Sequence, residues 1–393
     1  MGVYSEYLDK NLPFQDLVME RKRMLERISQ IRGRDVLSYA ADVTKAQQGA
    51  QVALDYSDLL PITDQVANLG GKALDVILET PGGSGETAED VVRILRERYD
   101  SVDFIVPGMA KSAGTIMVMS GDEILMDYMS ALGPIDAQIQ FEGKQFSAEA
   151  LIKGFEKIKD ESERTKSLNR AYIPMLQRIS PGDLQHAQNA LDFAKDLVTQ
   201  WLSAYKFKNW NVHRTHGPGD PVTQDEKVAR AGKVAEDLCN HSAWKTHGRS
   251  IRIQDLHAIG VEVIDFGQDP DLADAIRRYH VLLRMMFDST SAYKVMETPK
   301  SQIMRFLVSP TGPPAPIPGV AAPADGVIAG VQCDRCKQQH QLQMDFDVEK
   351  PLQAGNTRFP ANDILICSQC GNQINVSGIR QQVEMQTKRR VAR

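Results

Sequence analysis

Residues 78–95, LETPGGSGETAEDVVRIL, and residues 106–127, VPGMAKSAGTIMVMSGDEILMD, decide the fold of this chain. The apolar run over residues 73–80 predicts a buried strand, and the Pro-Gly-Gly turn after it predicts a tight loop. The rest of the first stretch has apolar residues at helical spacing, and a second strand, turn, helix and strand follow in the other stretch. Such alternation builds parallel crossovers, so an α/β core of repeated β-β-α and βαβ units is expected.

The composition indicates a globular chain with more than one folded unit. It has 393 residues, of which 42% are hydrophobic, and a formal net charge of -5. This negative charge argues against general electrostatic binding to nucleic acid or to an anionic membrane. No apolar run is long enough for a membrane span and the N-terminal residues are strongly charged, so a cytoplasmic location is expected.

Changes in pattern along the chain predict its organisation. Residues 15–47 have the spacing of a charged amphipathic helix, which is either an appended or partner-binding arm or a helix packed on the core. Residues 309–324, SPTGPPAPIPGVAAPA, have the composition of an extended linker. The expected units are an N-terminal helical arm (1–48), a core (49–308) with a helical insertion (about 147–242), a Pro-rich linker (309–326), a zinc ribbon (327–378) and a basic tail (379–393).

Ser112, in AKSAGT (110–115), is the candidate nucleophile. In a parallel sheet, sites form beyond the carboxyl ends of the strands, where the turn of Ser112 and the glycine loop are expected to meet. Small neighbours let a substrate carbonyl approach, and backbone N–H groups at a helix start hold a developing oxyanion. We expect these donors to come from Gly82, Gly83 and Ala113.

Two further motifs follow in chain order, ALGPIDAQI (131–139) and WKTHGRSI (244–251). Together with the two stretches above, they resemble the serine dehydrogenase proteinase family of the Clp-protease and signal-peptide-peptidase superfamily. The resemblance implies a serine endopeptidase with a triad in the order Ser, Asp, His: Ser112 as nucleophile, Asp136 as orienting carboxylate and His247 as base. A serine hydroxyl needs such partners, because it is a poor nucleophile until an imidazole accepts its proton.

Alternatives remain for each partner of Ser112. The other candidate carboxylates are Asp122 and Asp127, and the competing histidines are His213, His216 and His241. A Ser-Lys dyad would need a lysine with a lowered pKa, and the candidates are Lys153, Lys157, Lys159 and Lys166. Lys111 adjoins the nucleophile but is not nominated, because adjacent side chains near a helix start diverge.

Four cysteines at the C-terminal end predict a metal site. Cys333 and Cys336 form one C-x-x-C knuckle, and Cys367 and Cys370 form a second after 30 intervening residues. This pattern favours a structural zinc ion held by four thiolates, with no coordination position left for water. His340 is interpreted as incidental to this site.

The sequence therefore favours a serine peptidase acting on a protein or peptide, and the resemblance implies a homo-oligomer. A protein or nucleic-acid partner of the zinc ribbon is also compatible with the pattern. Two other classes stay open: a catalytically silent scaffold that works through the ribbon, and a crotonase-like acyl-CoA enzyme, which shares the crossover core and its glycine-based oxyanion hole.

Overall fold

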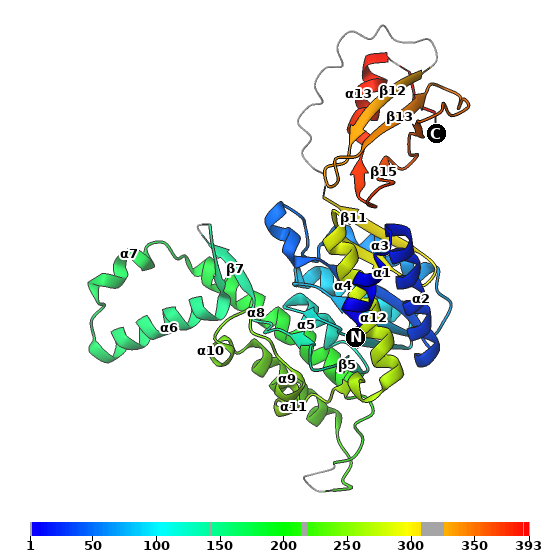
Figure 1. Ribbon diagram of the computed structural model, residues 1–393. Coiled ribbons are helices and arrows are strands. Elements are labelled where there is room, and N and C mark those ends of the chain that lie inside the picture. The colour runs from blue at the N-terminus through cyan, green and yellow to red at the C-terminus, as the bar shows by residue number, and fades with distance from the viewer. Residues whose placement is uncertain (1, 142, 214–217, 308–325, 388, 393) are drawn as a thin grey trace.

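The computed structural model describes residues 2–141, 143–213, 218–307, 326–387 and 389–392. Its main body contains a seven-stranded sheet in the order β11-β10-β1-β2-β3-β5-β9 (Figure 1). Four neighbouring pairs, from β1–β2 to β5–β9, are parallel, whereas β10 runs antiparallel to both β1 and β11. The α/β crossover core predicted from the sequence is confirmed. The strands are β1 (Asp35–Ala41), β2 (Ala73–Glu79), β3 (Ser101–Ile105), β5 (Ile124–Met126), β9 (Ile264–Asp265), β10 (Ala292–Glu297) and β11 (Gln302–Phe306).

Helices cover both faces of the sheet, which is why its central strands are apolar on both sides. In β2, Val76 and Leu78 belong to one core cluster and Ile77 to the other. The first cluster includes residues of α3, α4 and α5, and the second includes residues of α2 and α12, which lie side by side (Figure 1). These helices are α2 (Phe14–Arg32), α3 (Leu59–Ala67), α4 (Gly85–Arg98), α5 (Ala113–Val118) and α12 (Pro270–Ser289), with the short η1 (Val43–Gln48), η2 (Tyr56–Asp58) and η5 (Phe266–Gln268) between elements.

The N-terminal segment packs on the core, which was one of the two expected arrangements, and it is neither a separate arm over residues 1–48 nor one helix over residues 15–47. After α1 (Val3–Lys10), α2 packs on α12 and ends at Gly33, whose φ of 65° suits a glycine that terminates a helix. The next residues form β1, which lies between β2 and β10 in the sheet. All but the first residue of β1 are buried, as in a central strand of a sheet. The apolar residues of this segment therefore belong to a strand and do not continue the helix.

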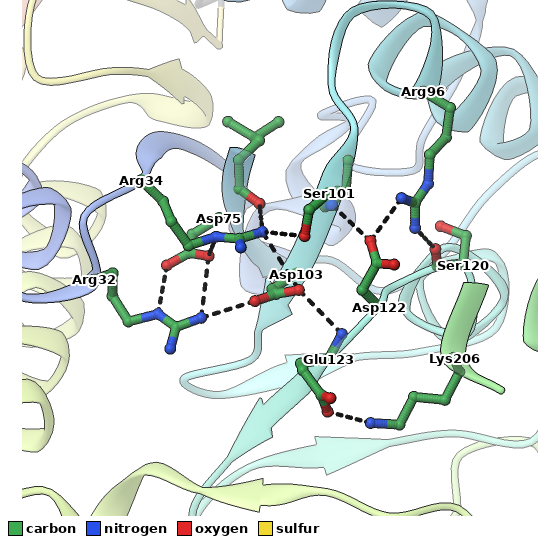
Figure 2. Close-up of polar contacts among 12 residues, drawn as sticks. Arg32, Arg34, Asp75, Arg96, Ser101, Asp103, Ser120, Asp122, Glu123 and Lys206 are labelled. Atoms are coloured by element: carbon green, nitrogen blue, oxygen red, sulfur yellow. Dashed lines mark hydrogen bonds and ion pairs between the residues drawn. The ribbon is translucent and has the colours of Figure 1, made fainter. Parts of the chain in front are cut away.

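A network of ion pairs joins the neighbouring strands β2 and β3 (Figure 2). Asp75 and Asp103 lie opposite each other in the register of these strands. Arg32 bridges them, with 2.8 Å from Nε to Asp75 Oδ2 and 2.8 Å from Nη2 to Asp103 Oδ2. Arg34 Nε contacts Asp75 Oδ1 at 2.6 Å. Each buried carboxylate therefore has guanidinium partners, as buried charges require.

The predicted helical insertion follows the crossover units. It begins after the hairpin of β7 (Gln138–Phe141) and β8 (Lys144–Ser147), and α6 and α7 extend away from the sheet (Figure 1). Ile251 makes an isolated bridge to Leu132, and Ile253 begins a helix. The helices of this region are α6 (Ala148–Thr165), η3 (Arg170–Tyr172), α7 (Ile173–Leu176), α8 (Pro181–Trp201), the π-helical η4 (Leu202–Lys206), α9 (Gln224–Cys239), α10 (His241–Trp244) and α11 (Ile253–Ala258).

The C-terminal unit has its own small core. Val383 and Val391 belong to this core and Arg389 pairs with Asp347 at 2.6 Å, so the prediction of a separate solvated tail over residues 379–393 is wrong for the described residues. Lys388, Arg393 and all but the last residue of the predicted linker (309–326) lie outside the described residues. The elements are β12 (Gly326–Gln332), β13 (Gln339–Asp345), β14 (Thr357–Arg358), β15 (Ile364–Ile366), β16 (Gln373–Asn375) and α13 (Ser377–Thr387).

Candidate active site and candidate metal centre

Ser112 lies in a strained turn between β4 (Met109–Ala110) and α5. Its backbone has φ 50° and ψ −119°, a combination that a serine rarely adopts. Surrounding contacts fix such a conformation: Lys111 N donates to Thr80 O at 3.0 Å, and Gly114 N donates to Lys111 O at 2.8 Å. The turn is thereby bound to the end of β2, where the sequence predicts the site, and the Ser112 side chain is partly buried.

The glycine loop after β2 packs directly on this turn. A Cβ atom on Gly82, whose φ is 107°, would lie 2.7 Å from Ser112 Cβ, so only glycine fits there. Gly82 N, one of the three expected oxyanion donors, donates to Thr80 Oγ1 at 3.2 Å. Within the described residues, the N–H groups of Gly83 and Ala113 have no protein acceptor. These two donors stay available for a substrate oxygen.

Asp136 binds two histidines at once. Its side chain is fully buried, and His247 Nδ1 lies 2.7 Å from Oδ1 while His241 Nδ1 lies 2.8 Å from Oδ2. Gln138 Nε2 also donates to Oδ2 at 3.0 Å. The carboxylate therefore orients both rings and leaves each Nε2 to face another partner. The structure thus brings Asp136 and His247 together across 110 intervening residues, and it adds His241, which the sequence presented only as a competitor.

Backbone contacts hold the segments of these residues together. Leu132 and Ile251 exchange two backbone hydrogen bonds of 2.9 Å, and Ile135 N donates to Leu238 O of α9 at 3.1 Å. β6 (Ala131–Leu132) also pairs in parallel with β4, immediately before Ser112. The loops that bear Asp136 and His247 are thus fixed beside the nucleophile turn. Within the described residues, Ser112 Oγ makes no hydrogen bond to an imidazole in this state.

The alternative candidates have other partners. Asp122 pairs with Arg96 at 2.7 Å and accepts from Val102 N, and Asp127 caps a turn by accepting from Met129 N at 2.8 Å. His213 contacts Glu226 at 3.1 Å, and His216 lies outside the described residues. The lysines considered for a dyad are exposed on or just after α6: Lys153, Lys157, Lys159 and Lys166. Their exposure does not fit a dyad lysine, which acts from a buried position.

The four C-terminal cysteines form a group that can hold a metal ion. Their sulfur atoms all lie within 4.8 Å of one another, and two Sγ–Sγ distances, Cys333 to Cys370 and Cys336 to Cys367, are 3.6 Å. Four thiolates about 2.3 Å from a tetrahedral zinc ion would be about 3.8 Å apart, so the spacing fits.

The surroundings of these sulfurs act on the thiols in opposite directions, because burial raises the pKa of Cys367 and raises that of Cys370 to about 12. His340 Nε2 lies 3.2 Å from Cys367 Sγ and is buried, so the interpretation of His340 as incidental is wrong. Burial opposes ionisation of Cys333, but backbone N–H groups of Cys336 and Arg335 outweigh it and lower the pKa of the Cys333 thiol to about 7. Such contacts orient metal ligands from outside.

Residues 7–174 match the family described as ClpP-like SDH-type serine proteinase. The match covers 168 of the 393 residues, less than half of the chain. It includes Ser112, Asp136 and the glycine loop, whereas His241, His247 and the four metal-site cysteines lie beyond it. The match begins within α1, so α2 and β1 lie inside the matched segment. The family predicted from the motifs is thereby confirmed for this part of the chain.

Two relatives are uncharacterized proteins of Methanocaldococcus jannaschii. MJ1495 is 29% identical over 108 residues, which cover 26% of this chain and 36% of that protein. MJ0137 is 34% identical over 85 residues, which cover 22% of this chain and 28% of that protein. The chain therefore spans only about a third of the length of the curated relatives that it matches.

Two solved structures resemble parts of the chain. A mutant of the 1510-N membrane-bound stomatin-specific protease is 18% identical, with a TM-score of 0.22 over 28% of this chain and 58% of the other. ClpP1 from Listeria monocytogenes is 8% identical, with a TM-score of 0.30 over 54% of this chain and 87% of the other. Within the described residues, no helix combines the length and apolar character that crossing a membrane requires.

Proposed function

We propose that this chain is a serine endopeptidase that cleaves proteins or peptides through an acyl-enzyme on Ser112. The observation that carries the proposal is the contact of 2.7 Å between His247 Nδ1 and the buried Asp136, on segments bound to the strained Ser112 turn. A carboxylate on Nδ1 selects the imidazole tautomer whose Nε2 accepts a proton. The family match over residues 7–174 supports the same reaction class.

The proposed reaction has two stages. Ser112 Oγ attacks the peptide carbonyl carbon while His247 Nε2 takes the hydroxyl proton, and the N–H groups of Gly83 and Ala113 bind the oxyanion. The intermediate collapses, the C–N bond breaks, and the imidazolium gives its proton to the leaving amine. Water then attacks the acyl-enzyme with His247 as base, which releases the new carboxylate and restores Ser112.

His241 is the second candidate for the base, because it contacts the same carboxylate at 2.8 Å. Replacing each histidine by glutamine separates the two. If His247 is the base, His247→Gln abolishes turnover, whereas His241→Gln only weakens it by removing one partner of Asp136. If His241→Gln abolishes turnover and His247→Gln only weakens it, His241 is the base.

We also assign zinc to the four cysteines, as a structural ion with every coordination position filled by thiolate. Cys333, Cys336, Cys367 and Cys370 would hold it, and the predicted division into core, helical insertion and zinc ribbon is retained from residue 49 onward. A homo-oligomer and a partner of the ribbon also belong to this proposal.

The test is digestion of denatured, fluorescently labelled casein by the full chain, with new peptide termini identified by mass spectrometry. Cleavage that disappears in Ser112→Ala is expected. Absence of cleavage by the wild type at every protein concentration would favour the scaffold, and binding of coenzyme A without cleavage would favour the crotonase-like reading.

A further inference from the structure

Lys111 directly precedes the nucleophile, yet its side chain leads away from Ser112. Its Nζ donates to Leu132 O at 2.8 Å, to Arg249 O at 2.9 Å and to Ser250 Oγ at 3.2 Å. The first acceptor lies on the segment that carries Asp136. The other two lie on the loop that carries His247. One ammonium group therefore joins the three segments that carry Ser112, Asp136 and His247.

Glycine at position 133 makes room for this side chain. A Cβ atom there would lie 2.7 Å from Lys111 Cδ, closer than side-chain carbons approach. The lysine stem thus runs across the backbone of Gly133, three residues before Asp136. The turn of Ser112 (residues 109–114) and the His247 loop (residues 244–250) are joined, within the described residues, by the hydrogen bonds from Lys111 Nζ to Arg249 O and Ser250 Oγ.

The environment of Lys111 defines what its nitrogen can do. All three of its acceptors are uncharged oxygens. The charged residues of the adjoining loop are Lys245, Arg249 and Arg252, and its titratable residue is His247. Arg252 itself donates to Met129 O and Ser130 O at 2.6 and 2.8 Å. Burial first, and the charge of Arg252 second, lower the pKa of Lys111 to about 8. The ammonium form dominates below that pH and gives the stronger hydrogen bonds to the two carbonyls.

We propose that Lys111 is a positioning residue that holds the His247 loop against the nucleophile turn, so that the imidazole reaches Ser112 Oγ. This inference rests on the proposed function. It differs from a Ser-Lys dyad, because Lys111 Nζ is a donor to carbonyls of distant segments and does not contact the neighbouring hydroxyl. Its action on the reaction passes through His247.

If Lys111 has this positioning role, the rate at which Ser112 reacts should decline at alkaline pH. The charged amine is present below its pKa of about 8 and is lost as the pH rises through it, which weakens the bonds to Leu132 O and Arg249 O. Arginine keeps its charge throughout this range. Lys111→Arg should therefore retain activity above pH 8, where the wild type loses it.

The experiment compares the rate at which a fluorophosphonate labels the full chain between pH 6 and pH 10. Lys111→Met keeps the stem without its donors, Lys111→Arg restores a cation, and Lys72→Met is the control on an exposed lysine. Lys111→Met is expected to slow labelling by about ten- to a hundredfold at pH 7, the range for lost hydrogen bonds of a charged group. Lys111→Arg should recover part of the rate and remove the alkaline decline. Labelling of Lys111→Met at the wild-type rate would overturn the inference.

A double variant separates positioning from general destabilisation. If Lys111 acts through His247, then Lys111→Met should have little further effect in a His247→Gln background. An equal fold-loss in both backgrounds would refute this coupling. Amide exchange supplies a readout independent of catalysis: in Lys111→Met, the Ile251 amide, which donates to Leu132 O, should exchange faster than in the wild type. A wild type that is never labelled would overturn the proposed function, and unchanged exchange at Ile251 would overturn the tether itself.

Discussion

Replacing Arg21 by methionine should destabilise the core far more than replacing Arg23 by methionine. Arg21 lies in α2 and reaches β10, where Nε and Nη2 donate to the two carboxylate oxygens of Glu297 at 2.9 and 3.1 Å. Both side chains have 0% exposure. Methionine preserves much of the volume but leaves a buried carboxylate with Tyr279 as its remaining strong donor, at 2.8 Å. Breaking a buried pair in this way costs about 3–5 kcal/mol.

Arg23 is the matched control in the same helix. It pairs with Glu20 at 2.7 Å, but its side chain is 68% exposed, so Arg23→Met should cost at most about 1 kcal/mol. The difference of at least about 2 kcal/mol corresponds to more than tenfold in the unfolding equilibrium. Urea unfolding followed by tryptophan fluorescence measures it, because all three tryptophans precede residue 245 and report on the core.

Adding Glu297→Gln to Arg21→Met should recover part of the loss, since the unpaired charge is then removed. Equal stabilities of Arg21→Met and Arg23→Met would refute the conclusion that α2 is an integral part of the core. Such a result would restore the interpretation of the N-terminal helix as an appended arm.

Three further predictions concern the glycine loop, the metal centre and the free cysteine. Gly83→Ala should destabilise the chain by about 2 kcal/mol more than Gly49→Ala in urea unfolding, because a Cβ on Gly83 would lie 2.3 Å from Leu54 O. Gly49 also has a positive φ, 86° against 151° for Gly83, but open space around it, and equal losses would contradict this reasoning. Elemental analysis should find one zinc ion per chain and less than half of that in Cys367→Ser, and full retention in the variant would refute the ligand set. Burial raises the pKa of the Cys239 thiol to about 12, so iodoacetamide at pH 8 should modify it after denaturation and leave it unmodified in the native chain, as peptide mass spectrometry would show.

The sequence predicted the elements whose signals are local. The strand ending at Glu79, the glycine turn and α4 follow one another within 26 residues, and alternation, turn chemistry and helical spacing each mark one of them. The two C-x-x-C knuckles are equally local. These features do not depend on distant contacts, so a single sequence suffices to find them.

The remaining features depend on contacts between distant parts of the chain. β1 was missed because its buried character comes from pairing with β2 and β10, as in the register of Ser38 with Glu297. Gly33 was the available signal that α2 ends before it. The packing of Val383 and Val391 on the ribbon is likewise invisible in a basic, polar segment.

Some residues of the candidate site could likewise be predicted from the sequence, and others depend on contacts between distant parts of the chain. Ser112 follows from its turn and its small neighbours, and the resemblance supplied Asp136 and His247. That two histidines share Asp136 could not be read from spacing, because α6 to α9 separate the carboxylate from both rings. The reach of Lys111 was missed for a related reason, since its acceptors lie 21 and 138 residues away in the chain.

Intact-protein mass spectrometry after reaction with a fluorophosphonate tests the central claim most directly. The account predicts a single adduct on the wild type that maps to Ser112, is absent in Ser112→Ala and forms at least a hundredfold more slowly in His247→Gln. Thermal unfolding of each variant would show that the fold is retained. A wild type without an adduct, or an adduct that persists in Ser112→Ala, would contradict the assignment of Ser112 as an activated nucleophile.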